Sequence, residues 1–191
     1  KNLGLPEETF YVSEETKQFF AGHRKSQEEC YRGWQQTFEA WRQANPELAR
    51  ELDEATKLEH PPVEDMLEAI PLFEDKPDAT RGSFGTALQP LAKMLPNLVS
   101  GSADLHGSTK NYLKELGDFQ RDNHSGRNLL FGIREHAMGG IVNGFGYYGL
   151  WRASGATFCV FSDYMRPAVR LAALAELPLF FIWTHDSVGV G

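Results

Sequence analysis

Glu135 is the residue whose place in the sequence points most directly to acid–base chemistry. It follows the apolar run NLLFGI (residues 128–133) and precedes a stretch in which Met138 and Val142 are apolar. An apolar setting favours the protonated form of a carboxyl group, so a carboxyl placed there could hold or share a proton near neutrality. A glutamate at a helix N-terminus is also stabilised by the helix dipole alone. Residue type leaves both interpretations open.

Three aromatic residues are spaced by three in the segment TFCVFSDY (157–164), namely Phe158, Phe161 and Tyr164. Side chains alternate between the faces of a strand, so Phe158 and Phe161 can share one face only if the chain turns after Val160. They would then form an aromatic cage that suits a flat heteroaromatic ligand. The alternative interpretation is two core phenylalanines and a helix tyrosine.

The segment GFGYYG (144–149) matches the spacing G-x-G-x-x-G. Such glycines bind a dinucleotide when they directly follow a strand and open a helix. Here they come at the far end of the helix predicted after NLLFGI. Helix packing and a C-terminal helix cap therefore explain these glycines better than a nucleotide does.

Other arrangements of reactive residue types are weaker. Ser162, His185 and Asp186 could be assembled into a hydrolase triad, but no G-x-S-x-G turn supports it. The six histidines are scattered, Cys30 and Cys159 are isolated, and the sequence has neither H-E-x-x-H nor C-x-x-C. We therefore expect no metal site built by this chain alone.

The composition of the 191-residue chain limits the classes of protein to which it can belong. Asp and Glu number 26 against 19 Lys and Arg, and the net charge of −7 disfavours binding to nucleic acid. The longest apolar stretch, residues 171–183, is interrupted by Glu176 and Pro178 and is too short to cross a membrane. Two cysteines and a start without a basic, apolar leader favour a cytoplasmic protein.

Beyond about residue 70, short apolar runs alternate with amphipathic segments. This alternation predicts an α/β fold in which a mostly parallel sheet is flanked by helices. Ligands of such sheets bind beyond the carboxyl ends of the strands, where polar residues stand here, Asp104, Glu135 and His185 among them. The predicted strands are 97–101, 128–133, 156–161 and 178–184, and the predicted helices are 80–94, 134–146 and 164–176.

Residues 1–70 are predicted to form a helical linker segment. The segment SQEE (26–29) has the spacing of a capping box, and Asn45 followed by Pro46 is typical of a helix start. Residues 59–77 contain four prolines and favour a connection between units. The aromatic residues of the first helix fall on one stripe, which indicates packing against another surface; they are Tyr31, Trp34, Phe38 and Trp41.

Taken together, the motifs resemble transketolase. The strongest are ATR (79–81), GSADL (101–105), FGIREHAM (131–138), TFCVFSDY and THDSVGVG (184–191). Residues 71–191 are similar to the pyrimidine-binding domain of that family, and the preceding helices resemble the linker from its diphosphate-binding domain. The resemblance implies a truncated thiamine diphosphate-binding fold and thiamine diphosphate-dependent transfer of a two-carbon ketol unit between sugar phosphates in the pentose phosphate pathway.

The resemblance gives the cofactor-facing residues their roles. Glu135 matches the glutamate that hydrogen-bonds the aminopyrimidine ring and favours the tautomer that takes a proton from the thiazolium carbon. Phe158, Phe161 and Tyr164 match the aromatic pocket for the pyrimidine. Asp104 matches a residue that approaches the cofactor from the subunit interface.

Three further residues match substrate-binding positions of the family. Arg81 and Ser108 match residues that hold the sugar phosphate, and His185 matches a histidine that binds substrate hydroxyls near the reacting carbon. The segment LHGS (105–108) differs from the Leu-Ala-Pro-Ser of many family members, which makes the match at Ser108 weaker than that at Asp104.

Some family features are not in this sequence. It has no G-D-G motif followed by Asn-Asn, so we expect Mg²⁺ and the diphosphate to bind to a diphosphate-binding domain of the same or a partner chain. The sequence ends inside the glycine-rich loop, and we therefore expect an incomplete C-terminus and a chain that is inactive alone. Family members complete this site across a homodimer.

The sequence leaves other functions open. Dihydroxyacetone synthase and 1-deoxyxylulose-phosphate synthase share the same cofactor chemistry, although the motif REHAM (134–138) favours the transketolase group. A non-catalytic or split-subunit relative would keep the fold without turnover by itself. A flavodoxin-like nucleotide binder would require the glycines at 144–149 to follow a strand directly.

Overall fold

The computed structural model describes residues 4, 6–75 and 77–186. The chain forms two compact units, residues 1–50 and residues 51–191. Within the described residues, no helix combines the length and apolar character that a membrane span requires.

The first unit is dominated by one long helix, α1 (Glu14–Ala44). It begins at Ser13, whose hydroxyl oxygen accepts a hydrogen bond from the Thr16 amide at 3.2 Å. The predicted capping box at residues 26–29 is therefore wrong as a helix start, because Ser26 lies inside a helix already capped at Ser13. The predicted aromatic stripe is confirmed, since rings along α1 stack at centroid distances of 5.1 to 5.7 Å.

Two shorter helices follow, α2 (Pro46–Thr56) and α3 (Val63–Ala69). The predicted start at Pro46 is confirmed, and the Asn45 carbonyl accepts the Ala49 amide at 2.9 Å. The proline-rich segment predicted as a connection contains α3, from which Met66 packs against a buried cluster of the second unit. The domain boundary near residue 70 stays a prediction.

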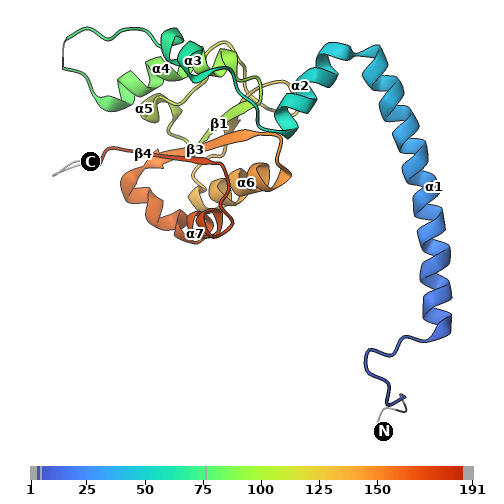
Figure 1. Ribbon diagram of the computed structural model, residues 1–191. Coiled ribbons are helices and arrows are strands. Elements are labelled where there is room, and N and C mark those ends of the chain that lie inside the picture. The colour runs from blue at the N-terminus through green and yellow to red at the C-terminus, as the bar shows by residue number, and fades with distance from the viewer. Residues whose placement is uncertain (1–3, 5, 76, 187–191) are drawn as a thin grey trace. The chain divides into compact units, whose positions relative to one another are not determined.

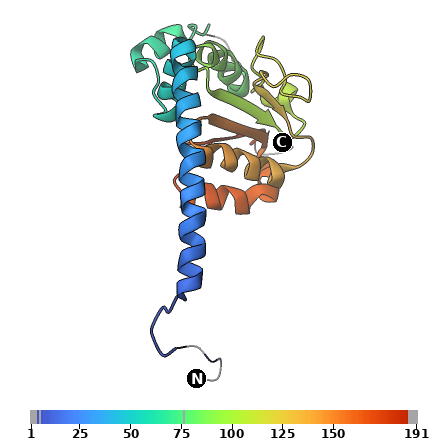
Figure 2. The ribbon, with the colours of Figure 1, turned by 90° about the vertical axis from the view of Figure 1, so that its right-hand side faces the viewer.

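The second unit contains a four-stranded sheet in the order β2-β1-β3-β4. Its strands are β1 (Leu98–Ser102), β2 (Asn128–Leu130), β3 (Arg152–Phe158) and β4 (Phe180–Thr184), and every pairing is parallel. Helices α4 (Thr80–Met94) and α5 (His106–Thr109) lie on one side of the sheet, and α6 (Glu135–Tyr148) and α7 (Arg166–Leu174) lie on the other (Figures 1 and 2). The predicted α/β architecture is confirmed.

The third strand differs from its prediction. We expected residues 156–161, whereas β3 spans Arg152–Phe158 and is followed by a 3₁₀ helix, η1 (Cys159–Met165). After Arg152 the strand has small residues, where α6 packs closely on it. A Cβ atom on Gly155 would lie 3.2 Å from Met138 and Val142. The predicted strand began too late because residues 153–155 carry no bulky apolar side chain.

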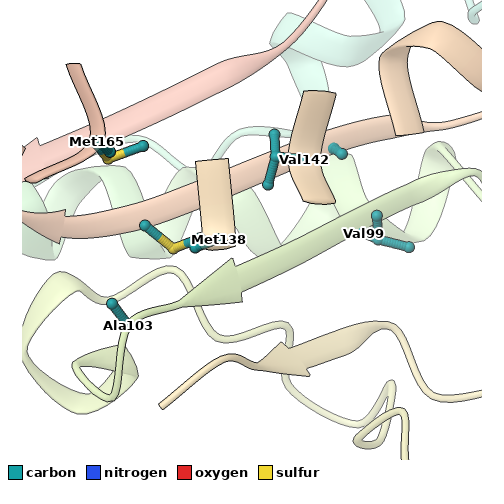
Figure 3. Packing of buried hydrophobic residues seen from close by; sticks show 6 residues of the cluster. Val99, Ala103, Met138, Val142 and Met165 are labelled. Atoms are coloured by element: carbon teal, nitrogen blue, oxygen red, sulfur yellow. The ribbon is translucent and has the colours of Figure 1, made fainter. Parts of the chain in front are cut away.

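The core of the second unit lies between α6 and the sheet. Its buried cluster comprises Val99, Ala103, Met138, Val142, Ala153 and Met165. Figure 3 shows Met138 and Val142 of α6 close to β3 and Val99 on β1. Burial of this apolar face fixes the position of α6, and therefore of its first residue, Glu135.

The glycines at 144–149 act as the sequence predicted. Gly149 has φ +81° and ends α6 in the left-handed conformation, and a Cβ on Gly146 would lie 3.0 Å from Leu179. Gly144 faces open space.

Two alanine substitutions in this segment are expected to have opposite effects on stability. We expect Gly149→Ala to lower the free energy of unfolding by about 1 kcal/mol, because a side chain is strained at positive φ. Gly144→Ala, in an open helical position, is expected to raise it by about 0.5–1 kcal/mol. Urea unfolding of the two variants checks both values, and equal changes of the same sign would contradict the assignment.

Candidate functional site

The carboxyl ends of the strands and the start of α6 surround a hollow of about 430 Å³. Four of the seven residues that line it were predicted as site residues, namely Asp104, Glu135, Phe161 and Tyr164. They come from the segment after β1, from α6 and from η1. The parallel sheet therefore brings together side chains that are far apart in the sequence. The other lining residues are Ala103, Leu105 and Ile133.

Glu135 forms a wall of the hollow and is only 7% exposed. It is the first residue of α6, and its neighbour one turn later, Met138, is fully buried. The expected apolar surroundings are thus present. The same position also places the carboxylate at the positive end of the helix dipole.

The three aromatic residues form a connected group. The chain turns after Phe158 into η1, and the rings of Phe158 and Phe161 stack at 5.7 Å with an interplanar angle of 11°. The ring of Tyr164 lies 6.3 Å from that of Phe161. The turn that this arrangement requires is present, and it comes after Phe158 rather than after Val160. Tyr164 is 66% exposed, so one side of this group is open.

His185 extends the aromatic group from the end of β4. Its ring centroid lies 3.9 Å from that of Phe158, and its Nδ1 lies 2.8 Å from the Thr184 hydroxyl oxygen. Its backbone is left-handed, with φ +60°. The rest of the motif, residues 187–191, lies outside the described residues.

Ser108 and Arg81 lie on neighbouring elements outside the hollow lining. Ser108 belongs to α5, and its amide donates to the Leu105 carbonyl at 2.8 Å. Arg81 is the second residue of α4. The two elements approach closely, because a Cβ on Gly85 of α4 would lie 2.7 Å from the carbonyl oxygen of Lys110. No contact joins Arg81 to the aromatic group among the interactions described.

The weaker chemical motifs gain no support from the structure. His185 contacts Thr184 and Phe158, and among the described interactions no hydrogen bond joins it to Ser162 or Asp186. In the described part of the chain, no group of three or more His, Cys, Asp and Glu side chains is placed to hold a metal ion.

Sequence reasoning missed the apolar part of the hollow. Ile133 ends the run that was predicted as a strand, but β2 stops at Leu130 and Gly132 has φ +64°. Ile133 therefore leaves the sheet and is 79% exposed. No periodicity in the sequence signals this exit. Ala103 and Leu105 are the sequence neighbours of Asp104, and this adjacency was the feature that could have identified them as lining residues.

His106, the first residue of α5, is a half-buried histidine. Burial lowers the pKa of His106 below its ordinary value of 6.5, although a hydrogen bond to the Leu129 carbonyl partly opposes this shift. Its Nε2 lies 3.3 Å from the Leu129 carbonyl oxygen, and its Nδ1 is buried with no hydrogen-bond partner among the described residues. The neutral form with its proton on Nε2 fits this setting.

This histidine predicts a loss of stability in mild acid. The unfolded chain takes up the His106 proton near pH 6.5, whereas the folded chain takes it up only at lower pH. The free energy of unfolding therefore falls as pH drops below about 6.5, by at most about 1.4 kcal/mol per pH unit from this group. Urea titrations between pH 5 and 8 measure the slope.

The variant His106→Gln is expected to reduce that slope, whereas His136→Gln, at an exposed position of α6, is expected to leave it as in the unmodified chain. Equal slopes in the unmodified chain and in His106→Gln would contradict the prediction.

The first 61 residues match the family described as the thiamine diphosphate binding domain of transketolase. Residues 76–191 match the pyrimidine binding domain of transketolase. The helical segment predicted as a linker thus carries the sequence pattern of the diphosphate-binding side, and the predicted boundary near residue 70 lies between the two matches.

Known transketolases resemble the chain along its whole length. The transketolase of Physarum polycephalum is 54% identical over 191 residues, and that of Dictyostelium discoideum is 56% identical over 192. Each match covers 100% of this chain, which spans 29% of the length of either relative.

Solved structures of transketolases also resemble this chain. The transketolase of Leishmania mexicana gives a TM-score of 0.89 at 30% identity, covering 97% of this chain and 28% of that one. A Pichia stipitis transketolase in complex with sedoheptulose 7-phosphate gives a TM-score of 0.86 at 35% identity, covering 96% and 28%. The match to the pyrimidine binding domain of transketolase covers more than half of this chain. The chain therefore belongs to the transketolase family.

Proposed function

We propose that this chain supplies the pyrimidine-binding half of a transketolase active site. The enzyme would transfer a two-carbon ketol unit between sugar phosphates, as in the pentose phosphate pathway. The observation that carries the proposal is a hollow lined by two carboxyl groups and two aromatic rings, those of Asp104, Glu135, Phe161 and Tyr164. The resemblance to complete transketolases over the whole chain supports it.

The side chains around the hollow fit the pyrimidine end of thiamine diphosphate. Stacked rings favour a flat aromatic group, and a nearly buried carboxyl offers a hydrogen bond to a polar ring edge. A volume of about 430 Å³ falls within the range of small-molecule sites. When bound, thiamine diphosphate supplies a thiazolium carbon that serves as the nucleophile towards the ketose.

Glu135 is the proposed acid–base residue of this half-site. Glu135 is the first residue of α6 and is 7% exposed, which limits the access of water to its carboxyl group. From this position Glu135 would hydrogen-bond to the polar edge of the aminopyrimidine and exchange a proton with it. General acid–base groups positioned in this way contribute about 10²–10⁴-fold to a rate.

The remaining predicted residues divide between cofactor and substrate. Phe158, Phe161 and Tyr164 stack against the pyrimidine and keep water from its face. Asp104 accepts hydrogen bonds at the rim of the hollow.

The proposed substrate residues lie beyond the hollow. His185, in contact with Phe158, orients the sugar hydroxyls. Arg81 and Ser108 bind the sugar phosphate, for which a guanidinium and a hydroxyl are suitable donors.

The proposal includes partners that complete the site. We propose that Mg²⁺ and the diphosphate are bound by residues outside this chain and that the complete enzyme is a homodimer. Two unpaired cysteines, Cys30 and Cys159, support a reducing, cytosolic location.

The test uses a chimeric enzyme in which this 191-residue chain replaces the matching stretch of the Dictyostelium discoideum transketolase. With thiamine diphosphate, Mg²⁺, xylulose 5-phosphate and ribose 5-phosphate, we expect turnover by the chimeric enzyme and none by the chain alone. A chimeric enzyme that melts cooperatively but neither binds the cofactor nor turns over would refute the proposal.

A further inference from the structure

The segment that follows β1 is held in an unusual backbone conformation. Asp104 has φ +64° and Lys110 has φ +61°, so two left-handed residues bracket α5. Left-handed residues other than glycine cost free energy and persist where the surrounding structure fixes them. Something must therefore hold Asp104 in place.

Ser102, the last residue of β1, makes the hydrogen bonds that hold this segment. Its hydroxyl donates to the Ala156 carbonyl of β3 at 3.1 Å and accepts from the Leu105 amide at 3.1 Å. Ser102 itself is fully buried. One hydroxyl thus connects the end of β3 to the peptide bond directly after Asp104.

Leu105 passes this restraint on to α5. Its carbonyl accepts hydrogen bonds from the amides of Ser108 and Thr109, both at 2.8 Å. Ser102 therefore fixes the amide side of Leu105, and the first turn of α5 fixes its carbonyl side. Both Asp104 and Ser108 depend on the orientation of this one residue.

Ser102 does not line the hollow, whereas Ala103, Asp104 and Leu105 do. We propose that Ser102 is a positioning residue, whose hydroxyl sets the direction of the Asp104 carboxylate at the hollow through the Leu105 peptide. The expected effect on cofactor affinity rests on the proposed function. The restraint of the Leu105 peptide by Ser102 does not.

A second buried serine provides a matched control. Ser154 of β3 is 4% exposed, and its hydroxyl donates to the Ser100 hydroxyl of β1 at 2.9 Å. It pairs with the middle of β1 and makes no hydrogen bond to residues 103–110 among those described. Ser154→Ala removes a buried hydroxyl of the same kind without releasing the segment.

The first experiment uses the 191-residue chain without cofactor. Amide hydrogen exchange of Leu105 is expected to accelerate about 5- to 10-fold in Ser102→Ala, the effect of losing one hydrogen bond, and to stay within twofold in Ser154→Ala. Unchanged exchange at Leu105 in Ser102→Ala, or equal acceleration in both variants, would overturn the restraint.

The second experiment measures thiamine diphosphate binding, in the presence of Mg²⁺, to the chimeric enzyme. We expect Ser102→Ala to raise Kd about 5- to 10-fold while kcat at saturating cofactor stays within twofold. In an Asp104→Ala background the same substitution is expected to change Kd by less than twofold, because its effect passes through Asp104. Ser154→Ala leaves Kd unchanged.

Independent effects of Ser102→Ala and Asp104→Ala on Kd would overturn the proposal. So would a Kd for Ser102→Ala equal to that of the unmodified chimera. If the unmodified chimera binds no thiamine diphosphate, the proposed function fails, while the exchange experiment on the chain still decides whether Ser102 restrains the segment.

Discussion

The Glu135→Gln variant of the chimeric enzyme is expected to lose about 10²–10⁴-fold in kcat for ketol transfer from xylulose 5-phosphate to ribose 5-phosphate. Glutamine keeps the shape of the side chain and a hydrogen bond, but it cannot hold or exchange a proton as a carboxyl does. Because Glu135 is 7% exposed, water cannot readily take over its role. Steady-state kinetics at saturating thiamine diphosphate measures the loss.

Glu115→Gln is the matched control for this experiment. Glu115 lies in the same unit, but its side chain is exposed and forms an ion pair with Lys93 at 3.2 Å, away from the hollow lining. We expect its kcat to stay within twofold of the unmodified chimera. A near-normal kcat for Glu135→Gln would remove the proposed acid–base role.

Phe161→Ala is expected to have the second largest effect, a rise of about 10- to 100-fold in Kd for thiamine diphosphate. The substitution removes both the stack on Phe158 and one wall of the hollow. Loss of an aromatic contact with its buried area is worth roughly 1.5–3 kcal/mol, which corresponds to this change in Kd. Fluorescence titration of the chimeric enzyme in the presence of Mg²⁺ measures it.

Val160→Ala tests whether this change is specific. Val160 is adjacent in η1 and 68% exposed, and it does not line the hollow. We expect its Kd to equal that of the unmodified chimera. If Phe161→Ala binds thiamine diphosphate as tightly as Val160→Ala does, the aromatic group is a packing feature and not a binding surface.

The elements of the second unit were predictable where large apolar residues mark them. The strand β1 and the helix α6 were predicted to within two residues because bulky apolar residues mark them, Leu98 and Val99 in β1 and Met138 and Val142 in α6. The strand β3 was misplaced because residues 153–155, which follow Arg152, have small side chains or none, and α6 packs closely on Gly155. Packing density rather than hydrophobicity decides such a strand, and the sequence alone does not reveal it.

The start of α1 shows a second reason why a prediction from sequence failed. Ser26 and Glu29 have capping-box spacing, yet Ser13 begins the helix and the later serine is an ordinary interior residue. A local motif predicts a helix start only when the preceding residues do not already form a helix.

Much of the candidate site was predictable, because parallel strands bring their carboxyl ends to one edge. Asp104 and Glu135 were therefore expected near each other, and both line the hollow. The left-handed backbones of Asp104 and His185 were not predicted. Near Asp104, the hydrogen bond from the Ser102 hydroxyl to the Ala156 carbonyl joins residues 54 apart in the sequence, and such a contact cannot be read from sequence spacing.

A crystal structure of the chimeric enzyme with thiamine diphosphate and Mg²⁺ tests the central claim most directly. We predict that the aminopyrimidine lies in the hollow against Phe161, with a ring nitrogen within about 2.6–3.2 Å of a Glu135 carboxyl oxygen. A cofactor whose pyrimidine lies elsewhere, with Glu135 touching only protein, would contradict the account.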